Sequence, residues 1–157
     1  MGTFSADEIY QFAIRIEENG GKFYRYAAEN ATDAKIKKVL GYMADEELKH
    51  RDKFKHMLSE IHDYEPEQSY PQEYFAYIRS YADHVLFSGE RMGGELDVVK
   101  DVVSALDFGI QRELDSILYY QEIKNLVPQK QHGSIEGIIS EERRHFTQLG
   151  DLKKSVR

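Results

Sequence analysis

Hydrophobic residues recur every three or four positions in four long stretches of the chain, a spacing that places them on one face of an α-helix. The first stretch consists of Ile9, Phe12, Ala13, Ile16, Gly20, Phe23 and Ala27. Just before it, Ser5-Ala-Asp-Glu8 forms a capping box, which satisfies the free backbone N–H groups where a helix starts. The pattern therefore predicts a first helix from this box to about Asn30.

A second apolar face follows directly, and Thr32 can cap the helix that carries it. Its inward positions are Ile36, Val39, Leu40, Met43, Glu47, His50, Phe54, Met57 and Leu58. A helix usually ends before the residue that precedes a proline. We therefore expect this helix to end near Tyr64-Glu65-Pro66.

Residues 64–93 contain two of the three prolines together with Gly89 and Gly93-Gly94, which predicts a connection rather than a long helix. Within it, Pro71 can start a short helix that reaches Tyr81. Two more long helices are expected at about 95–126 and 130–153. Their inward positions are Val99, Val102, Leu106, Ile110, Glu113, Ile117 and Tyr120, and then Ile135, Ile138, Ile139, Glu142, His145, Phe146 and Leu149.

These elements predict an all-α fold, a four-helix bundle made of two helical hairpins joined by a long crossover. Residues 1–157 are expected to form one domain, since that length suits a single core.

The inward positions of both hairpins include charged residues in a repeated arrangement. Glu47-Leu-Lys-His50 and Glu142-Arg-Arg-His145 are both Glu-x-x-His. Each follows a helix with one inward glutamate, in segments that match at an offset of 96: Ile14-x-x-Glu17-x-x-Gly20-x-x-Phe23-Tyr24 and Ile110-x-x-Glu113-x-x-Ser116-x-x-Tyr119-Tyr120. A single Glu-x-x-His arises by chance on charged helices, whereas two copies behind matching segments form a specific signal.

Positions i and i+3 share one face of a helix, so each Glu-x-x-His pair can aim at one point. The predicted metal ligands are Glu17, Glu47, His50, Glu113, Glu142 and His145. Four buried carboxylates would repel one another, and two divalent ions would cancel their charge. Carboxylate and imidazole donors suit iron or manganese, with zinc also acceptable. Gly20-Gly21 in the middle of a helix indicates a close backbone approach, as a crowded metal site needs.

Some neighbouring residues have simpler interpretations. Glu18, Glu46 and Glu141 lie beside the proposed ligands and are expected to be solvated. The histidines outside the repeat, namely His56, His62, His84 and His132, are expected at the surface. Tyr24 and Tyr120 are expected in the core, and a hydrogen bond to a ligand or a radical role stays open for both.

The composition of the chain excludes several kinds of site and of binding partner. The chain has no cysteine, which excludes disulfides, thiolate metal sites and iron–sulfur clusters. A net charge of −7 argues against nucleic-acid binding. No apolar run is long enough for a membrane span, and the first residues lack the features of a signal peptide, so we expect a cytoplasmic protein.

The repeat resembles that of the ferritin-like superfamily, and within it the rubrerythrin-like proteins. This resemblance covers nearly the whole chain apart from the crossover. It implies that Glu47 and Glu142 bridge two metal ions, that Glu17 and Glu113 are terminal ligands, and that His50 and His145 each supply one nitrogen. It also implies peroxide reduction, ferrous oxidation or oxygen chemistry.

The chain departs from the family pattern in two ways that affect function. Rubrerythrins usually carry an extra carboxylate ligand one turn before the third-helix glutamate, and here Ile110 occupies that place. Full rubrerythrins also contain a four-cysteine rubredoxin-type domain, and a chain without cysteine must take electrons from a separate donor protein.

Three functions remain open at this stage. The first is a diiron oxidoreductase acting on hydrogen peroxide or dioxygen, and the second is a ferrous-oxidising, iron-detoxifying protein without a further substrate. The third is a bundle with a structural or partner-binding role. The aromatic stretch from Tyr70 to Phe87 packs on its own bundle or forms an interface, and we expect a homodimer.

Overall fold

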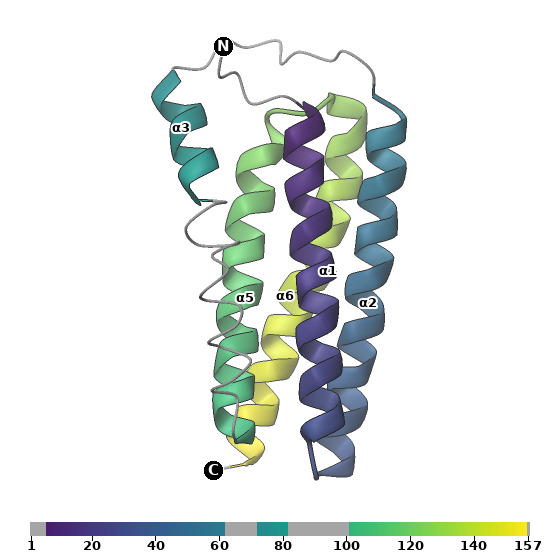
Figure 1. The fold of residues 1–157 in the computed structure, drawn as a ribbon, viewed down its shortest axis with the longest axis vertical. Helices are drawn as coiled ribbons and strands as arrows, with labels where there is room; N and C mark the ends of the chain where they lie inside the picture. The colour runs from purple at the N-terminus through teal and green to yellow at the C-terminus, as the bar shows by residue number, and fades with distance from the viewer. Residues whose placement is uncertain (1–5, 62–71, 82–100, 157) are drawn as a thin grey trace.

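The computed structural model describes residues 6–61, 72–81 and 101–156, and within them it is a bundle of four long α-helices with one short helix at its side (Figure 1). The long helices are α1 (Ala6–Asn30), α2 (Ala34–Ser59), α5 (Val102–Lys124) and α6 (His132–Ser155). The short helix α3 spans Gln72–Tyr81, and a 3-10 turn, η2, spans Gln129–Gln131. The predicted all-α fold is confirmed.

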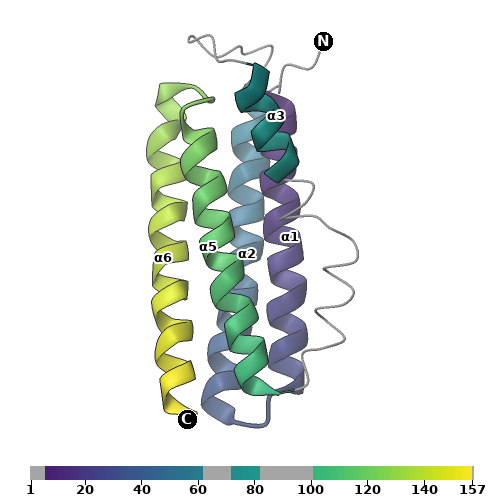
Figure 2. The same ribbon diagram turned by 90° about the vertical axis from the view of Figure 1, so that its left-hand side faces the viewer.

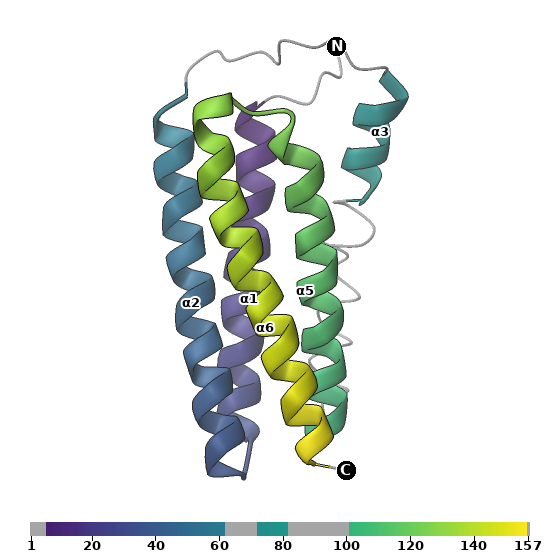
Figure 3. The ribbon, with the colours of Figure 1, turned by 180° about the vertical axis from the view of Figure 1, so that it is seen from behind.

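Helices α1 and α2 pack against each other as one antiparallel hairpin, and α5 and α6 form the other (Figures 2 and 3). In Figure 1, α1 runs downward, α2 and α5 run upward, and α6 runs downward. The end of α2 and the start of α5 therefore lie at opposite ends of the bundle. A connection along the full length of the bundle is required, as the two-hairpin arrangement predicts.

The ends of two helices differ from the predicted ends. Asp33, not Thr32, caps α2, because its side chain accepts a hydrogen bond from the backbone N–H of Ile36 at 3.0 Å. Helix α2 ends at Ser59 rather than near Pro66, because the N–H groups of Glu60 and Ile61 bond to carbonyls three residues back and tighten the last turn.

Helix α5 begins later than the predicted residue 95. Asp101 has an extended backbone and its side chain accepts from the N–H of Ser104 at 2.7 Å, which fixes the helix start at Val102. The proposed serine cap at residue 5, the start at Pro71 and the inward Val99 lie outside the described residues, as do His62 and His84.

The short helix α3 lies on the outside of its own bundle, beside α5 in Figure 1 and in front of α1 in Figure 2. Phe75 and Ile78 are buried, and the hydroxyl groups of Tyr74 and Tyr81 bond to Glu122 and to the backbone carbonyl of Asp115. Tyr77 is 48% exposed. The described part of the aromatic stretch thus largely covers its own bundle, and the homodimer stays a prediction.

The interior of the bundle contains two separate apolar clusters. One contains residues from the end where α5 turns into α6, among them Ile9, Phe54 and Ile138. The other contains residues toward the opposite end, among them Leu40 and Leu106. A layer of buried polar residues lies between them and includes the predicted ligands. Phe146, which was expected in the core, is 36% exposed, because the inner face of α6 turns from His145 to Leu149.

Candidate metal centre

All six predicted ligands meet in the polar layer between the two apolar clusters. Glu17 comes from α1, Glu47 and His50 from α2, Glu113 from α5, and Glu142 and His145 from α6. None of the six is more than 3% exposed. Each of the four helices therefore contributes at the same level of the bundle, as the positions of the ligands along the hairpins predict.

The six residues form two overlapping groups of metal donors. Glu17, Glu47, His50 and Glu142 form one group, and in each group the donor atoms lie within 4.8 Å of one another. The other group is Glu47, Glu113, Glu142 and His145. The imidazole rings of His50 and His145 are nearly parallel, with centroids 6.1 Å apart. Glu47 and Glu142 belong to both groups, which is the arrangement that bridging carboxylates would have.

Three donor atoms in this layer are buried without a hydrogen-bond partner: Oε2 of Glu17, Oε2 of Glu113 and Nδ1 of His145. A buried polar atom left unpaired costs free energy, about 1–3 kcal/mol each. All three belong to the two donor groups, and a bound cation would satisfy them. The residues present therefore fit the divalent metal ions that their chemistry suggests.

Two tyrosines hold the terminal carboxylates from across the bundle. The hydroxyl of Tyr120 on α5 donates to Oε1 of Glu17 on α1 at 2.6 Å. The hydroxyl of Tyr24 on α1 donates to Oε1 of Glu113 on α5, also at 2.6 Å. Both tyrosines are fully buried. Of the roles left open from the sequence, the hydrogen bond to a predicted ligand is the one that the structure contains.

The absence of a side chain at Gly20 leaves space for the buried layer of carboxylates. A Cβ atom added at Gly20 would lie 3.1 Å from Oε2 of Glu47 and 3.0 Å from Nη2 of Arg112. The Arg112 guanidinium also donates to the backbone carbonyl of Ile16 at 3.0 Å. The close approach predicted from the glycine pair is therefore confirmed at Gly20, and Arg112 is a neighbour of the site that the sequence did not indicate.

Burial and mutual repulsion set the protonation of the carboxylates in the absence of metal. Burial, together with the charge on Glu47, raises the pKa of Glu17 well above its usual value. Burial and the charges of Glu113, Glu47 and Glu17 do the same for the pKa of Glu142. Burial alone would raise the pKa of Glu47, but the neighbouring Glu17, His145 and His50 outweigh this effect and lower that pKa to about 2. The cluster thus keeps protons on some carboxylates and a charge on others.

His145 takes part in the same balance. Burial disfavours a charged imidazole, but the carboxylates of Glu113 and Glu47, each with an oxygen 3.7 Å from Nδ1, raise its pKa to about 10. A metal ion at Nδ1 must displace this proton, so cation binding and proton release are coupled.

The structure also places residues that the sequence analysis assigned to the surface. Oε2 of Glu141, expected in solvent, contacts Nε2 of His50. The signal that could have revealed Glu141 is its repetition, because Glu46 occupies the same place in the first half. His56 is exposed as expected, whereas His132 is half-buried beside the carbonyl of Val127. Ile110 is half-buried and packs against the second apolar cluster, outside both donor groups.

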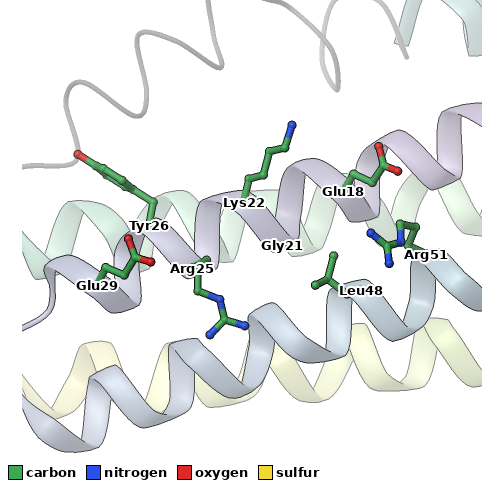
Figure 4. A pocket seen from close by; sticks show the side chains of 8 residues that line it. All are labelled: Glu18, Gly21, Lys22, Arg25, Tyr26, Glu29, Leu48 and Arg51. Carbon is green, nitrogen blue, oxygen red and sulfur yellow. The ribbon is translucent and has the colours of Figure 1, made fainter.

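A surface hollow of about 440 Å³ lies apart from this centre, between α1 and α2 (Figure 4). Gly21 and Leu48 form part of its lining, and Arg25 at its side pairs with Asp45. None of the six predicted ligands lines it. Gly21 lets α1 and α2 approach closely beside this hollow, because a Cβ atom added there would lie 3.0 Å from Cδ2 of Leu48.

The bundle and its buried layer of four glutamates and two histidines define a ferritin-like carboxylate protein. The sequence model of the rubrerythrin family matches residues 8–153. The chain belongs to the rubrerythrin family. This membership implies a dimetal site, and the two overlapping donor groups agree with it.

Among solved structures, one from Thermotoga maritima resembles the chain, and it is named as that of a candidate ferritin-like diiron-carboxylate protein. The two are 26% identical, with a TM-score of 0.68, over 96% of this chain and 95% of the other. No curated protein matches the chain. No helix in the described part of the chain is both long and apolar enough to cross a membrane.

Proposed function

We propose that this protein is a diiron carboxylate oxidoreductase that reduces hydrogen peroxide or dioxygen with electrons from a separate donor protein. One observation carries the proposal: six metal donors from four helices converge in a buried layer, and three of their atoms are otherwise unpartnered. Structural polar layers are normally fully hydrogen-bonded. An unsatisfied set of these donors instead supports a binding centre.

In this proposal, Glu47 and Glu142 bridge the two ions because both belong to both donor groups. Glu17 and Glu113 are the terminal carboxylates, and the tyrosines that bond to their other oxygens hold their orientation. His50 and His145 each supply one Nδ1 nitrogen, the ring atom that faces the carboxylates of the proposed ligands. Iron is the expected metal, and manganese or zinc would also fit these donors.

Two bound iron ions would supply two one-electron steps, which match the two electrons needed to reduce one peroxide molecule to two molecules of water. The chain's own residues provide the setting for that reaction. The apolar clusters above and below the layer limit the access of water. The reaction also consumes two protons, and the donor set contains groups that hold protons when no metal is bound.

The electron donor must be a separate molecule in this proposal, because a chain without cysteine lacks the thiolate ligands of a rubredoxin-type or iron–sulfur centre. We also propose a homodimer. Light scattering at micromolar concentration tests the dimer, and a mass near 18.3 kDa, that of one chain, would exclude it.

Ferrous oxidation without a further substrate is the second candidate function. It is favoured by Ile110, which packs in the apolar cluster where rubrerythrins usually carry an additional carboxylate. Stopped-flow oxidation of the anaerobic ferrous protein separates the two candidates. Faster oxidation by hydrogen peroxide than by dioxygen at equal concentration supports the first, and equal rates favour ferrous oxidation. A purely structural role would leave the purified, untagged protein free of bound metal.

A further inference from the structure

The two halves of the repeat share one further pair of equivalent residues, in addition to the six predicted metal ligands. Each Glu-x-x-His motif is preceded by a second glutamate, Glu46 in α2 and Glu141 in α6. By the repeat, the two should play the same role toward the histidines. In the structure the contacts of the two glutamates differ, and we expect this difference to affect metal binding.

Glu141 reaches from α6 across to α2, where its Oε2 contacts Nε2 of His50. The other nitrogen of that ring, Nδ1, lies 2.8 Å from Oε1 of Glu142 and 3.6 Å from Oε2 of Glu17. The His50 side chain is fully buried, so no water reaches either nitrogen from outside. One nitrogen of His50 therefore faces the predicted metal centre, and the other faces Glu141.

A neutral imidazole carries one proton, on either nitrogen. A carboxylate beside Nε2 favours the form with the proton there, which leaves the lone pair of Nδ1 directed at the centre. Such a carboxylate–histidine–metal arrangement fixes the ring, raises the basicity of the metal-binding nitrogen and strengthens metal binding. His50 is thus prepared to bind a cation before one arrives.

Glu46 gives His145 no such support. Its Oε1 accepts a hydrogen bond from Tyr42 at 2.7 Å, and its Oε2 lies 3.3 Å from Nζ of Lys49. Both carboxylate oxygens are therefore engaged with residues of α2 itself. The rings beside His145 are those of His50 and of Tyr42, the latter at a centroid distance of 6.5 Å, and Nδ1 of His145 has no hydrogen-bond partner.

We propose that Glu141 is a positioning residue for His50 that makes the two metal positions unequal, so that divalent cations fill them in order. The position of Glu17, Glu47, His50 and Glu142 binds first and more tightly, and the position of Glu47, Glu113, Glu142 and His145 binds second. The proposal rests on the dimetal centre put forward above. It adds that a nearly symmetric repeat holds two functionally different ions.

A different account would make Glu141 only part of a surface ion-pair network. Its Oε1 lies 3.8 Å from Nζ of Lys53 and 3.8 Å from Nη2 of Arg144. Both cations are at the limit of an ion pair and both are largely exposed, so these contacts contribute little. The contact with the fully buried His50 is the one that orients the Glu141 carboxylate.

The test is a titration of the metal-free full-length protein with Co²⁺ and with Zn²⁺, followed by absorption spectroscopy and calorimetry. The wild type should bind two ions in two separated steps. Glu141→Ala should weaken the first step by about 10–100-fold and bring the two steps together. Glu46→Ala is the matched control, since it removes the same charge at the equivalent position of the repeat, and it should leave the first step unchanged.

Two further measurements separate positioning from loss of structure. Glu141→Gln keeps an oxygen that can accept a hydrogen bond from Nε2–H, so it should restore part of the affinity lost in Glu141→Ala. Nitrogen NMR of the Zn²⁺-loaded protein should show His50 with its proton on Nε2 and its metal on Nδ1. In Glu141→Ala the signal of that proton should exchange rapidly with water.

The possible results distinguish failure of this inference from failure of the proposed function. Two equal binding steps in the wild type, or an equal loss in Glu46→Ala and Glu141→Ala, would overturn this inference and leave the dimetal centre intact. Absence of Co²⁺ and Zn²⁺ binding in the wild type would overturn both.

Discussion

Tyr120 on α5 donates a 2.6 Å hydrogen bond to Glu17 on α1, and the equivalent residue of the repeat, Tyr24 on α1, donates one of the same length to Glu113 on α5. The two hairpins thus orient each other's terminal carboxylate. Because the bond occupies one carboxylate oxygen in each case, the other oxygen is left to face the centre, where it has no partner.

Replacement of Tyr120 by phenylalanine should therefore lower metal affinity by about 10–100-fold, as loss of a residue that orients a ligand typically does. Tyr119→Phe is the control, because Tyr119 is equally buried but donates to the backbone carbonyl of Ile9 instead. Each variant should lose about 1 kcal/mol of stability with its hydrogen bond. A competition titration with Zn²⁺ measures the affinities. Equal affinities in the two variants would contradict an orienting role for Tyr120.

At Gly20, the lack of space for a side chain should affect stability more than helix propensity does. Alanine is favoured over glycine in a helix by up to about 1 kcal/mol. Gly137→Ala should gain part of that stability, since a Cβ atom there meets nothing within 4 Å. Gly20→Ala should instead lose stability and weaken metal binding, because its Cβ would press on Glu47 and Arg112. Urea unfolding of both variants checks this, and a Gly20→Ala protein as stable as Gly137→Ala would refute it.

The stability of the metal-free protein should fall as the pH rises from about 4.5 to about 10. His145 has a raised pKa of about 10, so its stabilising contribution is complete below about 6.5 and is lost as the pH rises through 10. The pKa values of Glu17 and Glu142 are also raised, and their contributions are lost in the same direction, starting above about 4.5. Glu47 acts oppositely, but its contribution disappears only as the pH falls toward about 2.

Bound metal should reverse this dependence of stability on pH. A bound divalent ion replaces the protons on these groups, so metal affinity should rise with pH over the same interval. Free energies of unfolding from urea titrations, with and without saturating Zn²⁺, measure both effects. A metal-free protein that becomes more stable toward pH 9 would show that the carboxylate layer does not hold its protons as described.

Glu142→Gln should abolish the binding of two ions rather than reduce it slightly, because Glu142 belongs to both donor groups. The metal-free variant should be as stable as the wild type or more stable at neutral pH, and its stability should depend less on pH, since one strongly shifted carboxyl group is gone. Glu136→Gln, a change on the same helix that removes an ion pair with Lys124, is the control. Metal analysis after gel filtration decides, and two ions retained by Glu142→Gln would exclude its bridging role.

Much of this architecture could be predicted from the sequence, because helical periodicity and the repeat both depend on spacing along one helix. Glu17, Glu47 and His50 face inward in the register that their apolar neighbours set. The helix ends were harder, because a cap depends on one side chain reaching one backbone group. Asp33 does this for α2, although Thr32 has the same chemistry one residue earlier.

Contacts between different helices could not be predicted from the spacing of residues along the sequence. Arg112 and Glu141 look like ordinary charged residues of an exposed face, and only the packing of α5 on α1 and of α6 on α2 brings them to the site. Both Glu46 and Glu141 were expected in solvent, but only Glu46 stays bonded to its own helix, through Tyr42 one turn before it, whereas Glu141 reaches His50.

The most direct test of a dimetal centre is the anomalous scattering at the iron edge from crystals of the iron-loaded protein. We expect two peaks about 3.5–4 Å apart, both between Glu47 and Glu142, with His50 on one side and His145 on the other. Iron found only at the protein surface, or no iron peak between the four helices, would contradict it.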